Sequence, residues 1–206
     1  MLNSGLFNKA VRKFCEKEGL LVVISSPTAG GKTTVGRELV KRGKGRVVRS
    51  VSATSRLPRK GERHGQDYFF VGENFRKLIG KKYFIEWEKV HESYYGTPLR
   101  YIEKQVARQK TIILTIDVKG GISIRQKYKN SVLIFLLPPS LDVLQERLNK
   151  RGTEDKKEAR IRLQTAVKEL KYIGKYDYLV INDRLADTVG TVESIIKAER
   201  QKITKR

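Results

Sequence analysis

Cysteine and histidine are nearly absent from this chain of 206 residues, which has one cysteine, Cys15, and two histidines, His64 and His91. A single cysteine excludes an intramolecular disulfide, and so few cysteine and histidine side chains argue against a zinc site built from them. The reducing cytosol is the natural compartment for such a chain, so we expect a cytoplasmic protein. Both histidines are interpreted as surface or lobe residues rather than catalysts.

Long apolar runs are also lacking, since no stretch approaches the roughly 18 residues that a membrane span needs. Acidic residues are scarce: 22 Asp and Glu stand against 44 Lys and Arg, which gives a net charge of +22. Such an excess implies polyanionic partners, either nucleic acid or highly charged nucleotides. Because the basic residues are spread along the whole chain, charge alone does not choose between them. A hydrophobic content of 39% indicates one soluble globular domain with a sizeable core.

The first 19 residues precede the first expected strand and carry apolar residues at helical spacing. We interpret residues 1–19 as an N-terminal extension that forms a short amphipathic helix. A transit peptide is the alternative, but Glu16, Glu18 and the scarcity of serine argue against it. A secretory signal would need a longer apolar region.

A phosphate-binding loop is indicated between the apolar run 20–24 and the helix-like segment 34–40. The intervening sequence matches the pattern G-x-x-x-x-G-K-[ST], with serine in place of the first glycine. Glycines let the backbone curl so that its N–H groups face anionic oxygens, and the following helix adds the positive end of its dipole. We assign ATP binding in this segment to Ser26, Pro27, Thr28, Ala29, Gly30, Gly31, Lys32, Thr33 and Thr34.

Within this loop, Lys32 can reach the β- and γ-phosphates of a nucleotide, and the Thr33 hydroxyl can bind Mg²⁺. Ser26 would strain the loop if its φ angle were positive, because only glycine adopts that conformation readily.

The remaining chain alternates strands and helices, which predicts an α/β domain with a central parallel sheet. Near-continuous apolar runs at 111–116 and 131–137 are typical of strands covered on both faces. Asp117 follows one strand and the phosphate-binding loop follows another, so we expect both at the same edge of the sheet. Strands are expected at 20–24, 46–52, 67–71, 83–90, 111–116, 131–137 and 178–181, and helices at 34–40, 73–79, 97–109, 118–129, 141–149, 160–173 and 188–202.

Two segments depart from this alternation. Residues 53–97 are basic and aromatic with little helix, which favours a compact inserted lobe in which Tyr94-Tyr95-Gly96 forms a turn. Residues 150–159 are polar and contain glycine, which favours a lid. A phosphate-binding loop with a lobe and a lid suits a nucleoside monophosphate kinase, because the lid excludes water while donor and acceptor meet. The acceptor phosphate is already anionic at neutral pH, so the reaction needs cations and alignment rather than a general base.

Several ordered motifs resemble those of guanylate kinases, from about residue 20 to the end of the chain. They lie at 50–62, 65–70, 84–87, 94–97, 116–120 and 151–154, and the first reads Ser-Val-Ser-Ala-Thr-Ser-Arg-Leu-Pro-Arg-Lys-Gly-Glu. The resemblance implies a three-layer α/β/α domain with a central parallel sheet over residues 20–206. Its core would take up 20–51, 98–149 and 161–206, with a GMP-binding lobe at 52–97 and a lid at 150–160.

The resemblance also implies a site for GMP in the lobe. A phosphate dianion is suited by two guanidinium forks and two phenols, here matched by Arg56, Arg59, Tyr68 and Tyr95. The residue matching Glu86 binds guanine, because a carboxylate accepts from the N1–H and the N2 amino group together, and adenine offers neither. A site of this kind can reject the wrong base by roughly 10⁴-fold. The implied GMP-binding residues are Ser52, Arg56, Arg59, Tyr68, Glu86, Tyr95, Thr97 and Asp117.

For the transfer step, the resemblance implies that arginines of the lid and its hinges close over the donor phosphates. The implied catalytic residues are Lys32, Arg56, Arg147, Arg151, Arg162 and Asp117. Mg²⁺ is the implied cofactor, bound by Thr33 and, through water, by Asp117. Thr115 stands where many members have an acidic residue, which leaves Asp117 as the main carboxylate near the metal. Asn182 matches a position near the donor adenine.

The expected function is therefore Mg²⁺-dependent transfer of the ATP γ-phosphoryl group to GMP, with dGMP as a second candidate acceptor. We expect a monomer or homodimer without nucleic-acid or membrane partners. Three alternatives stay open: a non-catalytic interaction domain of the same family, a kinase of the same fold for another phosphorylated substrate, and an RNA-binding protein. Lys32-Thr33 argues against the first and Glu86 with Ser52 against the second, while no RNA-recognition motif supports the third.

Overall fold

The computed structural model describes residues 19–90, 92–150 and 156–202, with the backbone alone described over 156–160. The expected N-terminal helix therefore lies outside the described residues except for its last position, and so do His91 and the middle of the expected lid. Within the described ranges, no helix is long and apolar enough to cross a membrane.

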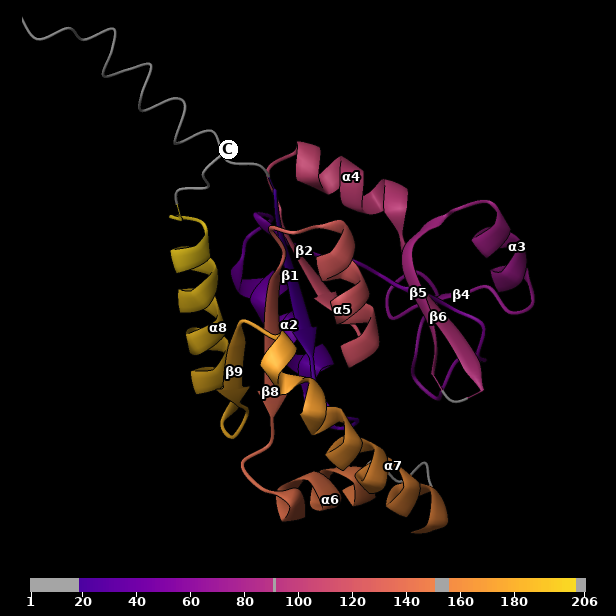
Figure 1. Cartoon of the computed structure of the whole chain (residues 1–206), viewed down its shortest axis with the longest axis vertical. Helices are drawn as coiled ribbons and strands as arrows, with labels where there is room; N and C mark the ends of the chain where they lie inside the picture. The colour runs from indigo at the N-terminus through magenta and orange to yellow at the C-terminus, as the bar shows by residue number, and fades with distance from the viewer. Residues whose placement is uncertain (1–18, 91, 151–155, 203–206) are drawn as a thin grey trace, which may run out of the picture.

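A sheet of five parallel strands forms the centre of the molecule, in the order β2-β7-β1-β8-β9 (Figure 1). The two inner neighbours of β1 are β7 and β8, which are buried on both faces, as their apolar runs predicted. The strands are β1 (Leu20–Ser25), β2 (Val47–Arg49), β7 (Thr111–Thr115), β8 (Val132–Leu137) and β9 (Tyr178–Ile181).

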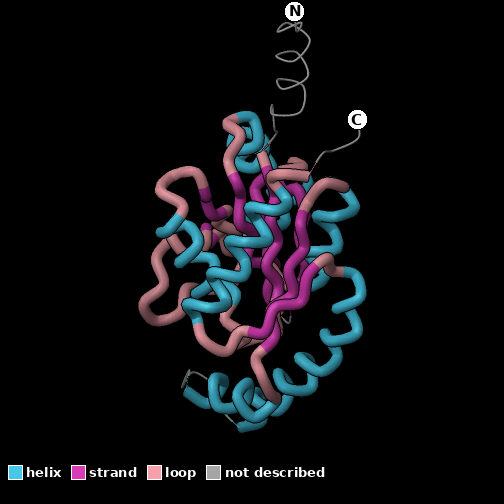
Figure 2. Tube along the Cα trace, turned by 90° about the vertical axis from the view of Figure 1, so that its left-hand side faces the viewer, coloured by secondary structure: helices cyan, strands magenta, loops and turns pink. Residues whose placement is uncertain are grey.

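Helices cover both faces of this sheet, which confirms the three-layer α/β/α architecture (Figure 2). Alternate residues of β1 point to opposite faces. Val22 and Ile24 pack in the cluster that contains α2 (Lys32–Arg42) and α8 (Leu185–Glu199). Leu21 and Val23 pack in the cluster on the other face, which contains α4 (Leu99–Ala107) and α5 (Val118–Lys127).

A second, four-stranded sheet builds the lobe, in the order β4-β3-β6-β5. It stands to one side of the main sheet with α3 at its outer end (Figure 1). Its small core is aromatic, since the Phe75 ring stacks on Phe84 at a centroid distance of 4.5 Å and on Tyr94 at 5.6 Å. The elements of the lobe are β3 (Ala53–Thr54), β4 (Phe69–Phe70), α3 (Asn74–Gly80), β5 (Phe84–Val90) and β6 (Ser93–Pro98).

The expected turn at Tyr94-Tyr95-Gly96 is wrong, because these residues lie within β6 and pair with β5 in antiparallel register. Aromatic residues favour the pleated, half-buried surface of a strand, and the chain reverses before Ser93 instead. The expected helix start at Thr97 is also wrong, since Thr97 belongs to β6 and Pro98 takes the N-cap position of α4.

A pair of helices, α6 (Leu141–Lys150) and α7 (Lys156–Glu169), projects beyond the carboxyl ends of the strands (Figure 1). Ser140 caps α6 as expected, with its Oγ accepting a hydrogen bond from the Val143 N–H at 3.2 Å. The helix α7 begins inside the range expected for the lid, four residues before the predicted start at 160. Leu144, Leu148 and Ala166 form a small apolar cluster against Ala29 of the phosphate-binding loop.

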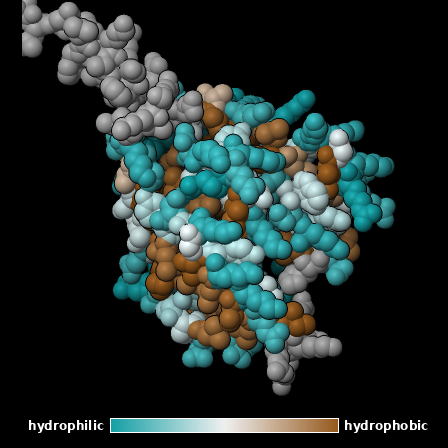
Figure 3. Space-filling view, viewed as in Figure 1, coloured by the Kyte–Doolittle hydropathy of each residue, from teal (hydrophilic) through white to brown (hydrophobic). Residues whose placement is uncertain are grey.

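The edge strand β9 leaves part of its apolar surface uncovered. Leu179 and Ile181 are each about half exposed, while Val180 between them is buried. Figure 3 shows hydrophobic groups gathered over this side of the molecule, whereas hydrophilic groups cover much of the rest of the face.

We predict that Phe75→Ala destabilises the protein by about 3–5 kcal/mol, because it removes the centre of the aromatic stack in the lobe. Urea denaturation measures the change in the free energy of unfolding. Leu57→Ala is the matched control in the same lobe, since Leu57 is 84% exposed, and it should change stability by less than about 0.5 kcal/mol. Equal effects of the two substitutions would contradict a separate lobe core.

Candidate active site

The phosphate-binding loop connects the end of β1 to the start of α2, as its sequence predicted. Positive φ angles within it occur at Ala29 (63°) and Gly31 (95°) and not at Ser26. The Ser26 hydroxyl donates a hydrogen bond to the Pro27 carbonyl at 2.9 Å. Serine in place of the first glycine therefore causes no backbone strain, because the left-handed conformations fall on other residues.

The lysine of this loop folds back over it. Lys32 Nζ donates to the Ser26 carbonyl oxygen at 3.3 Å, so the ammonium group lies at the mouth of the loop. Gly31 N-caps α2, whose first residue is Lys32. Backbone N–H groups at a helix N-terminus and a nearby ammonium group together make a site for phosphate oxygens.

Asn182, which follows the edge strand β9, is hydrogen-bonded to the phosphate-binding loop. Its Nδ2 donates to the Gly30 carbonyl at 2.8 Å, and its Oδ1 accepts from the Thr188 hydroxyl at 3.0 Å. A Cβ atom at Gly31 would lie 2.1 Å from Asn182 Nδ2, so a side chain at position 31 would displace the Asn182 amide. The loop-anchoring role of Asn182 was not identified from the sequence, and its expected proximity to adenine stays a prediction.

Asp117 lies at the same sheet edge as the loop, as expected, because β7 pairs in parallel with β1. Its Oδ1 accepts a hydrogen bond from the Gly120 N–H at 2.8 Å and caps α5. The Ser25 hydroxyl, at the end of β1, donates to the Asp117 carbonyl oxygen at 3.2 Å. The side chain and the carbonyl of Asp117 are thus both held by hydrogen bonds at the edge where β1 ends.

Glu169, at the end of α7, is a charged neighbour of the loop that the sequence did not single out. Burial raises its pKa to about 7, the nearby Lys32 ammonium opposes the rise, and Asp117 adds to it. The sequence alone does not predict this neighbour, because the position of a carboxylate near the end of a polar helix depends on how α7 packs against the rest of the domain. Glu169 thus lies in the electrostatic field of both the loop lysine and Asp117.

Glu86 is the buried carboxylate of the site, at 5% exposure on β5. The Thr97 hydroxyl on the neighbouring strand β6 donates to its Oε1 at 2.5 Å. A Cβ atom at Gly120 would lie 3.0 Å from Glu86 Oε2 and 3.6 Å from Asp117 Oδ1. The start of α5 therefore brings the lobe carboxylate next to the edge of the main sheet. Burial raises the pKa of Glu86 to about 7, against the lowering effect of the Thr97 hydrogen bond.

A second cluster in the lobe joins Arg56, Tyr68 and Tyr95. The Arg56 guanidinium lies 4.9 Å from the Tyr68 ring centroid, and its Nε donates to the Tyr95 hydroxyl at 3.2 Å. The two tyrosine rings meet edge to face at 5.8 Å. One cation and two phenols from separate segments thus converge, as expected. Arg59 is exposed, and Ser52 is half-buried ahead of β3.

The comparisons with known proteins agree with this geometry. A protein-family model described as guanylate kinase matches residues 18–199. The chain belongs to the guanylate kinase family. It is 41% identical over 189 residues to the guanylate kinase of Caldanaerobacter subterraneus subsp. tengcongensis and 42% identical over 189 residues to that of Thermotoga maritima, with 91% of each chain covered in both cases. The crystal structure of guanylate kinase from Anaplasma phagocytophilum superimposes with a TM-score of 0.76 at 31% identity, covering 90% of this chain and 88% of that one.

The arginines that the guanylate kinase resemblance assigned to the lid are described in part. Arg147, on α6, donates from Nη2 to the Asn182 carbonyl at 3.0 Å and to the Asp183 carbonyl at 3.4 Å. Arg162, on α7, is half-buried. Arg151 lies outside the described residues. Arg147 is therefore linked to the loop through Asn182, and the roles of all three in transfer stay predictions.

Two arginines of the core hold the lobe, and the sequence did not reveal them. Arg37, on α2, bonds the Asp67 carboxylate, and Arg49, on β2, bonds the Gln66 carbonyl. The Arg63 backbone N–H also donates to Asp67, at 2.9 Å, and this bond and the nearby cations hold the pKa of Asp67 below its ordinary value. These contacts join the lobe at residues 66–67 to α2 and β2 of the core.

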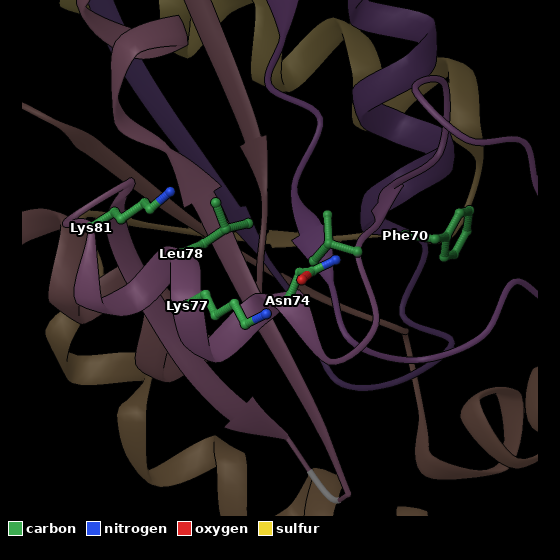
Figure 4. A pocket seen from close by; sticks show the side chains of 6 residues that line it. Phe70, Asn74, Lys77, Leu78 and Lys81 are labelled. Atoms are coloured by element: carbon green, nitrogen blue, oxygen red, sulfur yellow. The ribbon is translucent and has the colours of Figure 1, made fainter.

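A shallow cavity lies on the outer side of the lobe between β4 and α3, where Figure 4 shows Lys77 and Lys81 beside Leu78. None of its lining residues is assigned to GMP, although Phe70 adjoins the cluster around Arg56, whose guanidinium lies 5.6 Å from the Phe70 ring centroid. It is lined by Phe70, Val71, Asn74, Lys77, Leu78 and Lys81.

We predict that GMP binding weakens about tenfold between pH 8 and pH 6, because Glu86 must be ionised to accept guanine hydrogen bonds and its pKa is about 7. Isothermal titration at a series of pH values measures the dissociation constant. Protonation of the GMP phosphate, whose second pKa is about 6, adds a smaller decline. In the control variant Glu86→Gln, only protonation of the GMP phosphate changes the affinity with pH. Equal pH dependence of the dissociation constant in the two proteins would therefore contradict the assignment of Glu86 to guanine.

Proposed function

We propose that this chain transfers the γ-phosphoryl group of ATP to GMP, giving ADP and GDP, through the residues described above. The observation that carries the proposal is the buried Glu86 carboxylate, which lies against Gly120 at the sheet edge that also bears the phosphate-binding loop. Burial of this carboxylate is only partly offset by the Thr97 hydrogen bond and the nearby Lys127, so its placement suggests a ligand that donates hydrogen bonds. Guanine offers two such donors on one edge.

The donor nucleotide would occupy the loop between β1 and α2. Backbone N–H groups near Gly31 and the Lys32 ammonium would bind its β- and γ-phosphates. Asn182 holds this loop in shape by binding the Gly30 carbonyl, which limits the rearrangement needed when ATP binds. In the proposal, Asn182 therefore supports the donor site whether or not it also touches adenine.

The acceptor phosphate would bind between the Arg56 guanidinium and the hydroxyls of Tyr68 and Tyr95, with Arg59 closing from the exposed side. A guanidinium fork and phenols recognise a phosphate dianion by geometry as well as charge. The acceptor oxygen of this phosphate needs no deprotonation, because it is already anionic at neutral pH. The protein's tasks are alignment and relief of charge crowding.

Magnesium fits this site as an ion held mainly by nucleotide oxygens. Among the described residues, no three His, Cys, Asp or Glu side chains gather to hold a metal by themselves. Thr33 and, through water, Asp117 offer hard oxygen ligands beside the expected phosphates, which suits Mg²⁺ because it retains several waters. When bound, the ion would neutralise charge on the β- and γ-phosphates.

The helices α6 and α7 would supply the remaining positive charge. Arg147 and Arg162 come from this pair, and Arg151 follows α6 directly in sequence. We propose that these arginines close over the transferring group and exclude water. A cytoplasmic monomer or homodimer without nucleic-acid partners, and dGMP as a second acceptor, belong to the same proposal.

Lys32→Met tests the donor half of this proposal. Removing the ammonium should lower kcat by about 10²–10³-fold, as losing one preorganised donor to a transition-state charge does, and leave GMP affinity unchanged. A coupled assay for ADP release gives kcat, and titration calorimetry gives GMP affinity. Lys41→Met is the control, because Lys41 is an exposed lysine on the same helix. Unchanged turnover in Lys32→Met would overturn the loop's role.

A further inference from the structure

The Arg56 guanidinium is held at one edge by the carboxylate of Glu62. Arg56 Nη1 donates to Glu62 Oε2 and Arg56 Nη2 donates to Glu62 Oε1, both at 2.7 Å. The other Nη1 hydrogen binds the Leu57 carbonyl at 2.8 Å. Three of the five N–H groups of a guanidinium are thus used within the segment 56–62.

An adjacent edge of the same guanidinium faces Tyr95. Nε and the second Nη2 hydrogen share this edge, and Nε reaches the Tyr95 hydroxyl at 3.2 Å. The flat face of the guanidinium lies over the Tyr68 ring. Glu62 therefore binds one edge of Arg56, and the adjacent edge, on which Nε donates to Tyr95, is the one that an anion beside the tyrosines would contact.

Glu62 also fixes the backbone that carries this arginine. Its Oε2 accepts a hydrogen bond from the Arg59 backbone N–H at 2.8 Å. Although burial pushes the other way, the hydrogen bonds from Arg56 and Arg59 hold the pKa of Glu62 below its ordinary value, so the carboxylate is ionised at neutral pH. One side chain thus ties together both arginines assigned to the phosphate.

We propose that Glu62 is a positioning residue for the acceptor phosphate, which acts through Arg56 and does not touch the ligand itself. The inference rests on the proposed function, since it takes Arg56 as the phosphate-binding group. An arginine side chain loses rotational freedom when it binds an anion, and Glu62 has already removed that freedom in the ligand-free protein. Preorganisation outweighs the partial neutralisation of Arg56, because the phosphate approaches the edge that Glu62 does not occupy.

The test compares the binding of GMP with that of guanosine, which lacks the phosphate. Glu62→Gln keeps the shape of the side chain but places an amide donor against the guanidinium. We expect the dissociation constant for GMP to rise about tenfold, the scale of a charge-assisted hydrogen bond, with guanosine binding unchanged. Glu62→Asp keeps the charge with a shorter reach and should give a smaller loss. Glu73→Gln, at an exposed carboxylate of the same lobe, should have no effect.

A double-mutant cycle shows whether Glu62 acts through Arg56. In the Arg56→Ala background, Glu62→Gln should cause no further loss of GMP affinity. Tighter GMP binding in Glu62→Gln would overturn the inference, because Glu62 would then compete with the phosphate. Equal losses for GMP and guanosine would also overturn it, by showing a general disturbance of the lobe.

The failure of the proposed function would look different. If Arg56→Ala itself leaves GMP affinity unchanged, the phosphate site is placed wrongly and both proposals fall. If Arg56→Ala weakens GMP binding while Glu62→Gln does not, the phosphate site stands and only the positioning role of Glu62 is refuted.

Discussion

The parallel pairing of β1 with its neighbours is the constraint on which the site depends. Because all five strands of the main sheet run the same way, the segments that follow β1, β7 and β9 leave at one edge. The phosphate-binding loop, Asp117 and Asn182 therefore meet although they lie far apart in sequence. Two hydrogen bonds connect them: the Ser25 hydroxyl donates to the Asp117 carbonyl, and the Asn182 side-chain amide donates to the Gly30 carbonyl. The capped start of α5 extends this edge to the lobe, where Gly120 packs against Glu86.

Carboxylates are few in this basic chain, and their surroundings give them opposite properties. Glu86 is buried among groups that only partly offset its desolvation, so its pKa is raised to about 7. Glu62 is bound by Arg56 and by a backbone N–H, so its pKa is lowered. The environment of Glu86 suits a group that accepts hydrogen bonds from neutral donors. The environment of Glu62 suits a permanently charged counter-ion that orients a cation. Residue type alone would not separate these two roles.

The sequence predicted the features that depend on local pattern. The phosphate-binding loop, the parallel sheet covered on both faces and the shared edge for Asp117 follow from apolar runs, glycine spacing and strand order. Predictions failed where tertiary pairing decides: Tyr94 to Gly96 form a strand because β5 lies alongside, and α7 starts earlier than composition indicated. Three further features arise from contacts across the fold, which one sequence does not specify. They are the hydrogen bond of Asn182 to the loop, the proximity of Glu169 to Lys32, and the ion pair of Glu62 with Arg56.

The most direct test of the account measures ADP release from Mg-ATP with GMP, AMP, CMP and UMP as alternative acceptors. The account predicts turnover with GMP at a kcat/KM that exceeds that of the other nucleotides by about 10⁴-fold, since only guanine satisfies the buried carboxylate of Glu86. Retained GMP binding without turnover of any acceptor would contradict it and would indicate a non-catalytic interaction domain built on the same fold.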